Sequence, residues 1–314
     1  MPKFSIIIPT YNRAELLSNA IRSILGQTYG DFELIIVNDG SNDKTEEVVK
    51  SFDDQRIVYI RHEINKGVYA GENTGVRASN GEYIIFLGDD DKFYPDALLL
   101  VYSKIKEYFS DNVKILWFDS IDIDTEVCAS QNDKKERFIS YKDLLCDTFK
   151  IDPIVVLESN LLKNKMISEG FWGDSGTIWL DFYKNDSKCL PLYVPQIICE
   201  ARSLHGQHMS HAEIAIGNIS KVIMAQQFFL KNYGKELIKH CPQRYGQRQA
   251  MTGFYQILNG EKKEGRANII KSFEFNFSFK YFFYFLFSYI LTGHALKYFY
   301  KIFSKLKRFI FHSN

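Results

Sequence analysis

The stretch YIIFLGDDD, at residues 83–91, joins an apolar run to three adjacent carboxylates. An uninterrupted apolar run of this length predicts a buried strand, so the aspartates follow its carboxyl end. Carboxylates this close together repel one another unless a cation or a metal-bound polyphosphate neutralises them. Earlier in the chain, FELIIVNDGS at residues 32–41 has the same layout. Ligands of an open parallel α/β sheet bind outside the carboxyl ends of its strands, so these two loops predict one nucleotide–metal site.

The N-terminal part of the chain alternates strands with helices. Strands are predicted at 4–8, 32–37, 57–60, 83–87 and 113–118. The patterns Asn12-x-x-Glu15 and Asp43-x-x-Glu46 resemble capping boxes and predict two helix starts, and Pro95 is expected to open a third helix. Short connections and apolar strands indicate a largely parallel sheet covered on both faces, which is an α/β, Rossmann-like fold.

Composition excludes several classes of protein. The net charge is +1, so no overall positive field favours nucleic acid. The five cysteines are scattered and include no C-x-x-C pair, which argues against a zinc site. The first turn lacks the G-x-G-x-x-G pattern of dinucleotide dehydrogenases. The first predicted strand begins at Phe4, which leaves no room for a signal peptide, so we expect a cytoplasmic protein.

The C-terminal third changes character. Helices are predicted at 219–233 and 244–273, and no acidic residue follows Glu274. Residues 281–291 are almost wholly apolar but too few to span a bilayer, which takes about 20 residues. A basic amphipathic pattern follows over 297–310. We predict that the tail, residues 276–314, lies on an anionic membrane surface; the alternative is an ordinary helix packed on the domain with its lysines in solvent.

Four elements in order resemble the signatures of the family 2 glycosyltransferases. They are FSIIIPTYN at 4–12, VNDGS at 37–41, NKG at 65–67, and FLGDDD at 86–91 followed by Pro95. The resemblance covers roughly residues 3–119. It implies an inverting enzyme of the GT-A fold, with a mostly parallel mixed sheet, that takes a nucleotide-sugar donor.

The resemblance also implies a division of the chain. We expect a GT-A domain over 1–215, with a nucleotide-binding half at 1–119 and an acceptor-binding half at 120–215. A helical region at 216–275 and the tail at 276–314 would follow.

The resemblance places a divalent cation, Mg²⁺ or Mn²⁺, at the aspartate triplet. Counting back from Pro95 puts the last aspartate of the family's Asp-x-Asp motif on Asp90, and Gly88 stands where its first aspartate is expected. Asp90 and Asp91 are therefore the predicted metal ligands, and Asp89 is predicted to contact the ribose or the metal through water. The alternative is that the triplet only caps or solvates a loop.

Asp39 resembles the family's aspartate that accepts a hydrogen bond from the nucleobase. A carboxylate suits the ring N–H of uracil or thymine, which favours a UDP- or dTDP-linked sugar; an Asx turn is the alternative. The first loop, comprising Pro9, Thr10, Tyr11 and Asn12, is predicted to contact base and ribose. Tyr11 is equally compatible with plain packing.

Asn73 is a predicted donor contact in a motif that normally has Arg immediately before it. This chain has Glu72 there, and either Arg77 or Lys66 is a possible substitute. Alternatively, Asn73 only holds this segment against the sheet.

An inverting transfer also needs a general base near the acceptor hydroxyl. The family supplies an Asp or Glu ahead of a helix, often as a Glu-Asp pair, which this chain lacks. Asp174 is the first candidate, Asp181 the second and Glu169 the third. A helix N-cap is the alternative role for Asp174.

The segment from Arg202 to His211 contains His205 and His208 as well. Related transferases often close such a segment over the diphosphate, and that role is preferred to a zinc pair or an inert loop.

Together these features predict transfer of a sugar from a nucleotide donor to an acceptor hydroxyl. By family analogy, the basic tail makes a lipid-linked oligosaccharide of surface-polysaccharide synthesis a sensible acceptor. Two alternatives stay open: a catalytically inactive nucleotide-binding scaffold of a polysaccharide complex, and a nucleotidyltransferase.

Overall fold

The computed structural model describes residues 1–108, 113–128, 134–149, 153–169, 177–185, 189–201, 212–291, 294–298 and 300–301. Internal contacts divide the chain into two compact units. The first unit comprises Met1–Gly170 with Ile178–His205, and the second comprises Phe171–Thr177 with Gly206–Asn314.

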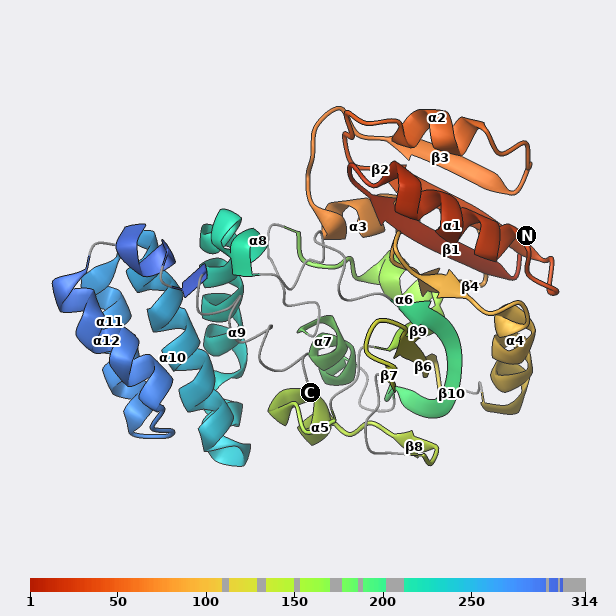
Figure 1. The fold of residues 1–314 in the computed structure, drawn as a ribbon. Helices are drawn as coiled ribbons and strands as arrows, with labels where there is room; N and C mark the ends of the chain where they lie inside the picture. The colour runs from red at the N-terminus through yellow and green to blue at the C-terminus, as the bar shows by residue number, and fades with distance from the viewer. Residues whose placement is uncertain are drawn as a thin grey trace. The chain divides into compact units, whose positions relative to one another are not determined.

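A mixed sheet forms the centre of the first unit (Figure 1). Its strands are β1 (Phe4–Thr10), β2 (Phe32–Asn38), β3 (Ile57–Arg61), β4 (Tyr83–Phe86), β5 (Lys92–Phe93), β6 (Ile115–Asp122), β7 (Val127–Cys128), β8 (Arg137–Phe138), β9 (Ile154–Glu158) and β10 (Leu192–Ala201). The main order is β3-β2-β1-β4-β9-β6-β10-β5. The first four of these strands pair in parallel, which confirms the predicted α/β class.

Beyond β4 the sheet is mixed, as predicted for the GT-A fold. The strand expected at 113–118 is β6, but it does not pair with β4. Instead β9 lies between them and pairs antiparallel with both, so β6 still runs in the direction of β4. The carboxyl ends of β1, β2, β4 and β6 therefore lie along one edge.

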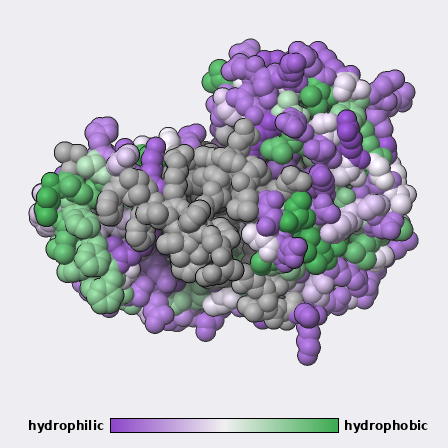
Figure 2. All heavy atoms as spheres, in the orientation of Figure 1, coloured by the Kyte–Doolittle hydropathy of each residue, from purple (hydrophilic) through white to green (hydrophobic). Residues whose placement is uncertain are grey.

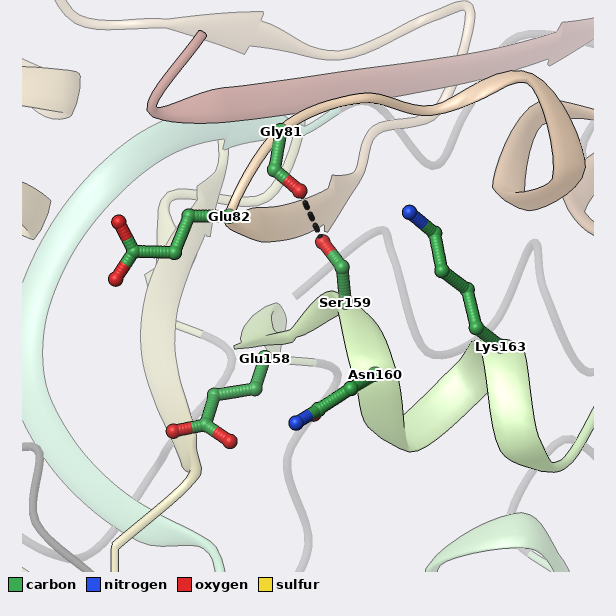
Figure 3. Close-up of a pocket in the computed structure, with 6 residues that line it drawn as sticks. All are labelled: Gly81, Glu82, Glu158, Ser159, Asn160 and Lys163. Carbon is green, nitrogen blue, oxygen red and sulfur yellow. Dashed lines mark hydrogen bonds between the residues drawn. The ribbon is translucent and has the colours of Figure 1, made fainter. Parts of the chain in front are cut away.

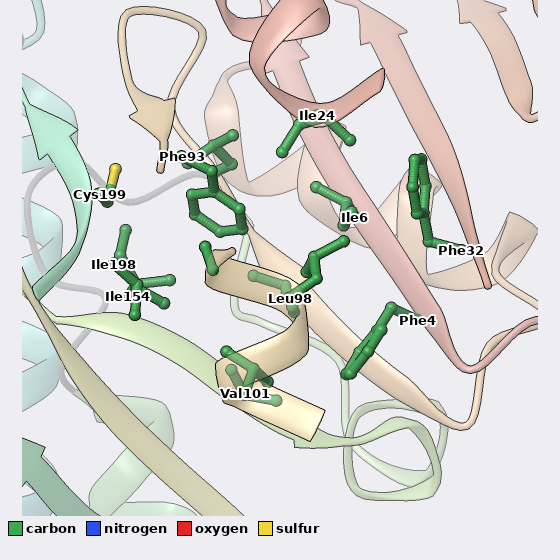
Figure 4. Packing of buried hydrophobic residues seen from close by; sticks show 14 of the residues in the cluster. Phe4, Ile6, Ile24, Phe32, Phe93, Leu98, Val101, Ile154, Ile198 and Cys199 are labelled. Carbon is green, nitrogen blue, oxygen red and sulfur yellow. The ribbon is translucent and has the colours of Figure 1, made fainter. Parts of the chain in front are cut away.

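Helices cover both faces of this sheet. They are α1 (Ala14–Leu25), α2 (Thr45–Lys50), α3 (Val68–Ala78), α4 (Ala97–Tyr108), α5 (Tyr141–Cys146), α6 (Ser159–Asn164) and α7 (Thr177–Asn185). Apolar side chains of α1 and α4, such as Ile24 and Leu98, pack on alternate strand residues, such as Ile6 (Figure 4). The opposite face receives α3, which contacts β1 and β2. Burial on both faces explains why the strands are continuously apolar.

The predicted capping boxes are not formed. Helix α1 begins at Ala14, and the Ala14 N–H donates to Asp43 from the next loop at 3.0 Å. Asn12 has a φ of 54° and accepts from the Asn42 N–H at 2.8 Å instead of capping its own helix. Asp43 does accept from the Thr45 N–H, but Glu46 pairs with Lys50 and Arg61 rather than closing a box. A partner from another loop replaced the local one at α1, whereas at α2 the glutamate pairs with lysine and arginine side chains.

The second unit is helical in its described residues. Its helices are α8 (Ala212–Gly217), α9 (Ile219–His240), α10 (Pro242–Asn259), α11 (Lys262–Phe273) and α12 (Phe279–Ile290). The helix predicted at 244–273 is divided because Gly260 takes a φ of 97°, which glycine tolerates and which ends α10. Within the described ranges, no helix is both long and apolar enough to span a membrane.

Candidate functional site at the carboxyl edge of the sheet

Thr10 joins the loops that follow β1, β2 and β4. It is the last residue of β1 and lies beside Asn38, the last residue of β2. Its carbonyl accepts the Asp39 N–H at 2.9 Å, and its hydroxyl donates to Asp89 Oδ2 at 2.7 Å. One residue thus connects the predicted nucleobase contact with the aspartate triplet.

The charge of the triplet is balanced in part by Arg13. Its Nη1 lies 2.8 Å from Asp89 Oδ1 and 3.2 Å from Asp90 Oδ2. Asp89 is only 5% exposed, and burial raises the pKa of this carboxyl although Arg13 and Thr10 oppose the rise. Arg13 therefore stabilises carboxylates that the fold has removed from solvent.

Asp90 and Asp91 converge over Gly88. A β-carbon added at Gly88 would lie 2.7 Å from Asp90 Oδ1 and 2.7 Å from Asp91 Oδ2. The first aspartate of an Asp-x-Asp motif would not fit here unless both carboxylates moved. The same geometry brings an oxygen of Asp90 and an oxygen of Asp91 close to one point, and oxygens of this kind are the ligands that Mg²⁺ and Mn²⁺ prefer.

Asp90 and Asp91 are the two carboxylates that the described residues offer at this point. No cluster of three or more His, Cys, Asp or Glu that could hold a metal occurs in the described part of the chain. A divalent cation that bridges phosphates characteristically keeps one or two protein carboxylates and takes its other ligands from substrate and water. The donor set of Asp90 and Asp91 fits that pattern.

Cys199 of β10 lies near the same carboxylates. Strand β5, directly after Asp91, pairs with β10 at Cys199 and Glu200. Burial, together with the charges of Asp91 and Asp90, raises the pKa of the Cys199 thiol well above its usual value. Burial and these neighbouring carboxylates therefore favour the neutral thiol.

Asp39 is a buried carboxylate with three donors around it. It is 3% exposed, its Oδ1 lies 2.7 Å from His62 Nδ1, and the backbone N–H groups of Lys66 and Gly67 donate to it at 2.9 and 2.7 Å. Its predicted contact with a nucleobase is not tested by these contacts. They show that the loop at 62–67 holds the carboxylate in place.

The other residues predicted in the first loop differ in exposure. Tyr11 is 42% exposed at the edge of the sheet and is accessible to a ligand. Pro9 and Asn12 are partly buried. The Asn12 amide oxygen and backbone N–H bond to Asn42 and Ser41, so this residue links the first two loops.

Asn73 is engaged inside the first unit. Its amide nitrogen donates to the Ile167 carbonyl and to Glu169 at 2.8 Å each, and its amide oxygen accepts the Ile167 N–H. These contacts anchor α3 to residues 167–169. A donor contact from Asn73 stays a prediction.

Glu72 occupies the position where the family has Arg. It is partly buried, and no hydrogen bond or ion pair to it occurs among the described residues. Desolvation raises the pKa of its carboxyl to about 8. Near neutral pH the Glu72 carboxyl is therefore largely protonated. Compared with the family's Arg, this position lacks a positive charge but does not carry a full negative one.

The candidates for the general base are only partly described. Asp174, Arg202 and the three histidines at 205, 208 and 211 lie outside the described residues. Asp181 lies on α7 and forms an ion pair with Lys165 at 3.1 Å. Glu169 contacts Asn73 and lies 3.5 Å from Arg77.

A cavity of about 360 Å³ lies elsewhere in the first unit (Figure 3). Its lining residues are Gly81, Glu82, Glu158, Ser159, Asn160 and Lys163. Gly81 and Glu82 precede β4, whereas the triplet follows it, so the cavity lies at the opposite edge of the sheet. The Ser159 hydroxyl closes part of this edge by donating to the Gly81 carbonyl. The cavity is therefore separate from the candidate site.

Sequence reasoning missed the residues that hold this site together. Arg13, His62 and Asp43 contact partners that are 23 to 77 positions away in the chain. Their only local signal is a polar side chain just after a predicted strand or just before a helix, and that signal names no partner.

Comparisons with known proteins agree with this geometry. A sequence model described as Glycosyl transferase family 2 matches residues 5–154. The GalNAc(5)-diNAcBac-PP-undecaprenol beta-1,3-glucosyltransferase of Campylobacter jejuni is 34% identical over 190 residues, which are 60% of this chain and 62% of that protein. The putative colanic acid biosynthesis glycosyl transferase WcaA of Escherichia coli is 40% identical over 99 residues, 31% of this chain and 36% of the relative. The chain thus spans less than two thirds of either relative.

Solved structures share the fold. TarS of S. aureus, residues 1–349 in complex with UDP-GlcNAc, gives a TM-score of 0.59 at 16% identity and covers 86% of this chain and 89% of its own. The mannosyltransferase PcManGT from Pyrobaculum calidifontis, in complex with GDP-Man and Mn²⁺, gives 0.55 at 14% identity, with 97% and 88% covered. The matched motifs, the relatives and the GT-A arrangement of the sheet agree, and residues 5–154 form a domain of the family 2 glycosyltransferases.

Proposed function

We propose that this protein is an inverting glycosyltransferase that moves a sugar from a UDP- or dTDP-linked donor to an acceptor hydroxyl. The observation that supports the proposal is the pair of bonds made by Thr10, which connect Asp39 and the aspartate triplet at one edge of the sheet. A nucleotide sugar has a base at one end and a diphosphate at the other. A site with a base-recognising carboxylate at one end and a cation-binding pair at the other matches that ligand.

Asp90 and Asp91 would hold Mg²⁺ or Mn²⁺ in this site. When bound, such a cation supplies Lewis-acid stabilisation of the charge that develops on the leaving diphosphate. Asp89, held by Thr10 and Arg13, would contact the ribose or a metal-bound water. The exposed ring of Tyr11 would pack against base and ribose.

The general base would come from the acceptor half. We keep Asp174 as the first candidate and Asp181 as the second. The carboxylate would take the proton of the acceptor hydroxyl as that oxygen attacks the anomeric carbon from the side opposite the diphosphate. Replacing the true base by Asn should lower kcat at least 100-fold while leaving the affinity for the nucleotide unchanged.

The acceptor we propose is a lipid-linked oligosaccharide of surface-polysaccharide synthesis, reached at the inner face of the cell membrane. Two relatives support it by name, one acting on a PP-undecaprenol substrate and one assigned to colanic acid biosynthesis. The UDP-GlcNAc complex of TarS supports a uridine donor.

The first test is nucleotide binding. Thermal shifts with UDP, dTDP, CDP, GDP and ADP, each with and without Mn²⁺, should show stabilisation by a uracil or thymine nucleotide that depends on the metal. Asp90→Ala should abolish the metal dependence. No shift with any nucleotide in folded protein would refute the proposed function.

The exposed face of α12 supports attachment to the membrane. Phe279, Phe283, Leu286 and Ile290 lie on one side of this helix at three- and four-residue spacing and are 41–80% exposed. Apolar residues of the second unit gather in a green area in Figure 2. Tyr284, on the other side of α12, is buried in the helical core. Aromatic side chains next to a basic segment without acidic residues suit an anionic bilayer surface.

Deleting 276–314 would also remove Tyr284 from that core, so surface substitutions give the cleaner test. Phe279→Ser with Phe283→Ser should lower binding to vesicles of phosphatidylglycerol at least tenfold. Ile270→Ser, which changes an exposed apolar residue of α11, should leave it unchanged. Equal vesicle binding by all three proteins would contradict the membrane proposal.

A further inference from the structure

A hydrogen-bonded chain links Asp39 to helix α3 through a buried histidine. His62 is 7% exposed, its Nδ1 lies 2.7 Å from Asp39 Oδ1, and its Nε2 lies 2.9 Å from Thr74 Oγ1. Thr74 belongs to α3, and His62 directly follows β3. The ring therefore connects the loop after β2 with the helix that covers the sheet.

The chemistry of the three groups sets the direction of this chain. An ionised carboxylate only accepts hydrogen bonds, so His62 must carry its proton on Nδ1 and donate to Asp39. In the neutral imidazole, Nε2 then accepts from the Thr74 hydroxyl. Asp39 thus fixes the tautomer of the ring, and Thr74 helps to fix its angle, as a further partner commonly does for a functional histidine.

Among the contacts of Asp39, the histidine is the side-chain donor. Oδ1 receives His62 and the Lys66 N–H, while Oδ2 receives the Gly67 N–H. A carboxylate has about four acceptor positions, and donors from the described residues fill three of them, so the fourth position is on Oδ2. A nucleobase imide N–H is a single donor and needs one such place.

We propose that His62 is a positioning residue for nucleobase recognition, which holds Asp39 so that Oδ2 accepts the ring N–H of uracil or thymine. This inference rests on the proposed function. It adds that selectivity for the base depends on a histidine with no contact to the base itself. Thr74 supports this orientation of Asp39 indirectly, through its hydrogen bond to His62.

The test compares UDP with N3-methyl-UDP, which lacks the imide N–H, by calorimetric titration in Mn²⁺. The wild type should bind UDP at least tenfold more tightly, as expected for a hydrogen bond to a charged group. His62→Phe keeps an aromatic ring but removes both nitrogens, and it should reduce the preference to about twofold or less by weakening UDP alone. A residue with a merely structural role would lower the affinity for both ligands equally.

Two further variants refine the result. His62→Asn places an amide nitrogen near the position of Nδ1 and should restore most of the preference for UDP. Thr74→Val removes the hydroxyl at nearly constant volume and should reduce the preference about threefold. If His62→Phe does not fold, these two variants decide the question.

The possible failures are distinguishable. A wild type that binds no nucleotide refutes the proposed function and this inference with it. A wild type that binds UDP and N3-methyl-UDP equally well, or a folded His62→Phe with an undiminished preference, refutes the inference and leaves the glycosyltransferase proposal standing.

Discussion

The burial of Glu72 on helix α3 can be tested quantitatively through the pH dependence of folding stability. Its carboxyl has a pKa of about 8 in the folded protein, against 4.5 for a solvated glutamate, because burial disfavours the charged form. Between these two values the folded state holds a proton here that the unfolded state has released. Folding stability must therefore fall as the pH rises from 4.5 to about 8.

The size of this effect follows from the same values. One pKa unit corresponds to about 1.4 kcal/mol, so the full difference is about 3–5 kcal/mol. The side chain keeps part of its surface in solvent, and local relaxation reduces the penalty, so we expect about 2–4 kcal/mol. Glu72→Gln carries no titratable proton and should escape this loss.

The assay is urea unfolding of the wild type and Glu72→Gln at pH 5 and pH 9. The two proteins should have similar unfolding free energies at pH 5, and the variant should be more stable at pH 9 by about 2–4 kcal/mol. Glu63→Gln, at an exposed position of the preceding loop, is the matched control and should follow the wild type at both values. A difference below about 0.5 kcal/mol between Glu72→Gln and the wild type at pH 9 would refute the reasoning.

Three further predictions concern the site and its supports. Gly88→Ala should reduce at least tenfold the gain in nucleotide affinity that Mn²⁺ gives, without unfolding the protein, because the added methyl group would push the carboxylates of Asp90 and Asp91 apart. An unchanged Mn²⁺ titration would contradict this prediction. Arg13→Gln should lower the free energy of unfolding, measured in urea, by about 2–4 kcal/mol, because Asp89 and Asp90 lose their ion pairs with the guanidinium group. A loss near zero would show that these carboxylates move into solvent. Asn73→Ala should lower the free energy of unfolding by about 1–3 kcal/mol and leave the KM for the donor unchanged if the Asn73 amide only anchors α3. A raised KM in folded protein would favour a direct contact with the donor.

Local pattern determined much of the fold. The apolar runs at β1, β2 and β4 predicted strands because continuous burial on both faces needs continuous apolar character. The order of the loops then predicted that Asp39 and the aspartate triplet lie at the same edge, since carboxyl ends of parallel strands share an edge. Both inferences use the spacing of apolar residues and the order of strands and loops along the chain, which can be read directly from a sequence.

Where local signals competed with distant partners, prediction from the sequence was wrong. The Asn12 capping box matched its pattern, yet Asp43 binds the first turn of α1 and Asn12 bonds to Asn42. The position of β9 between β4 and β6 was not predicted at all, because the pairing partners of a strand depend on the packing of the whole sheet.

The sequence by itself determined the class of fold, the edge that carries the site and the aspartates gathered there. Tertiary structure alone decided how those groups are held: Arg13 between two carboxylates, Gly88 beneath a converging pair, and His62 behind Asp39. These contacts join loops far apart in the chain, and no spacing rule connects such loops. Their energies exist only once the sheet has brought its strand ends together and excluded the water that would otherwise satisfy each polar group.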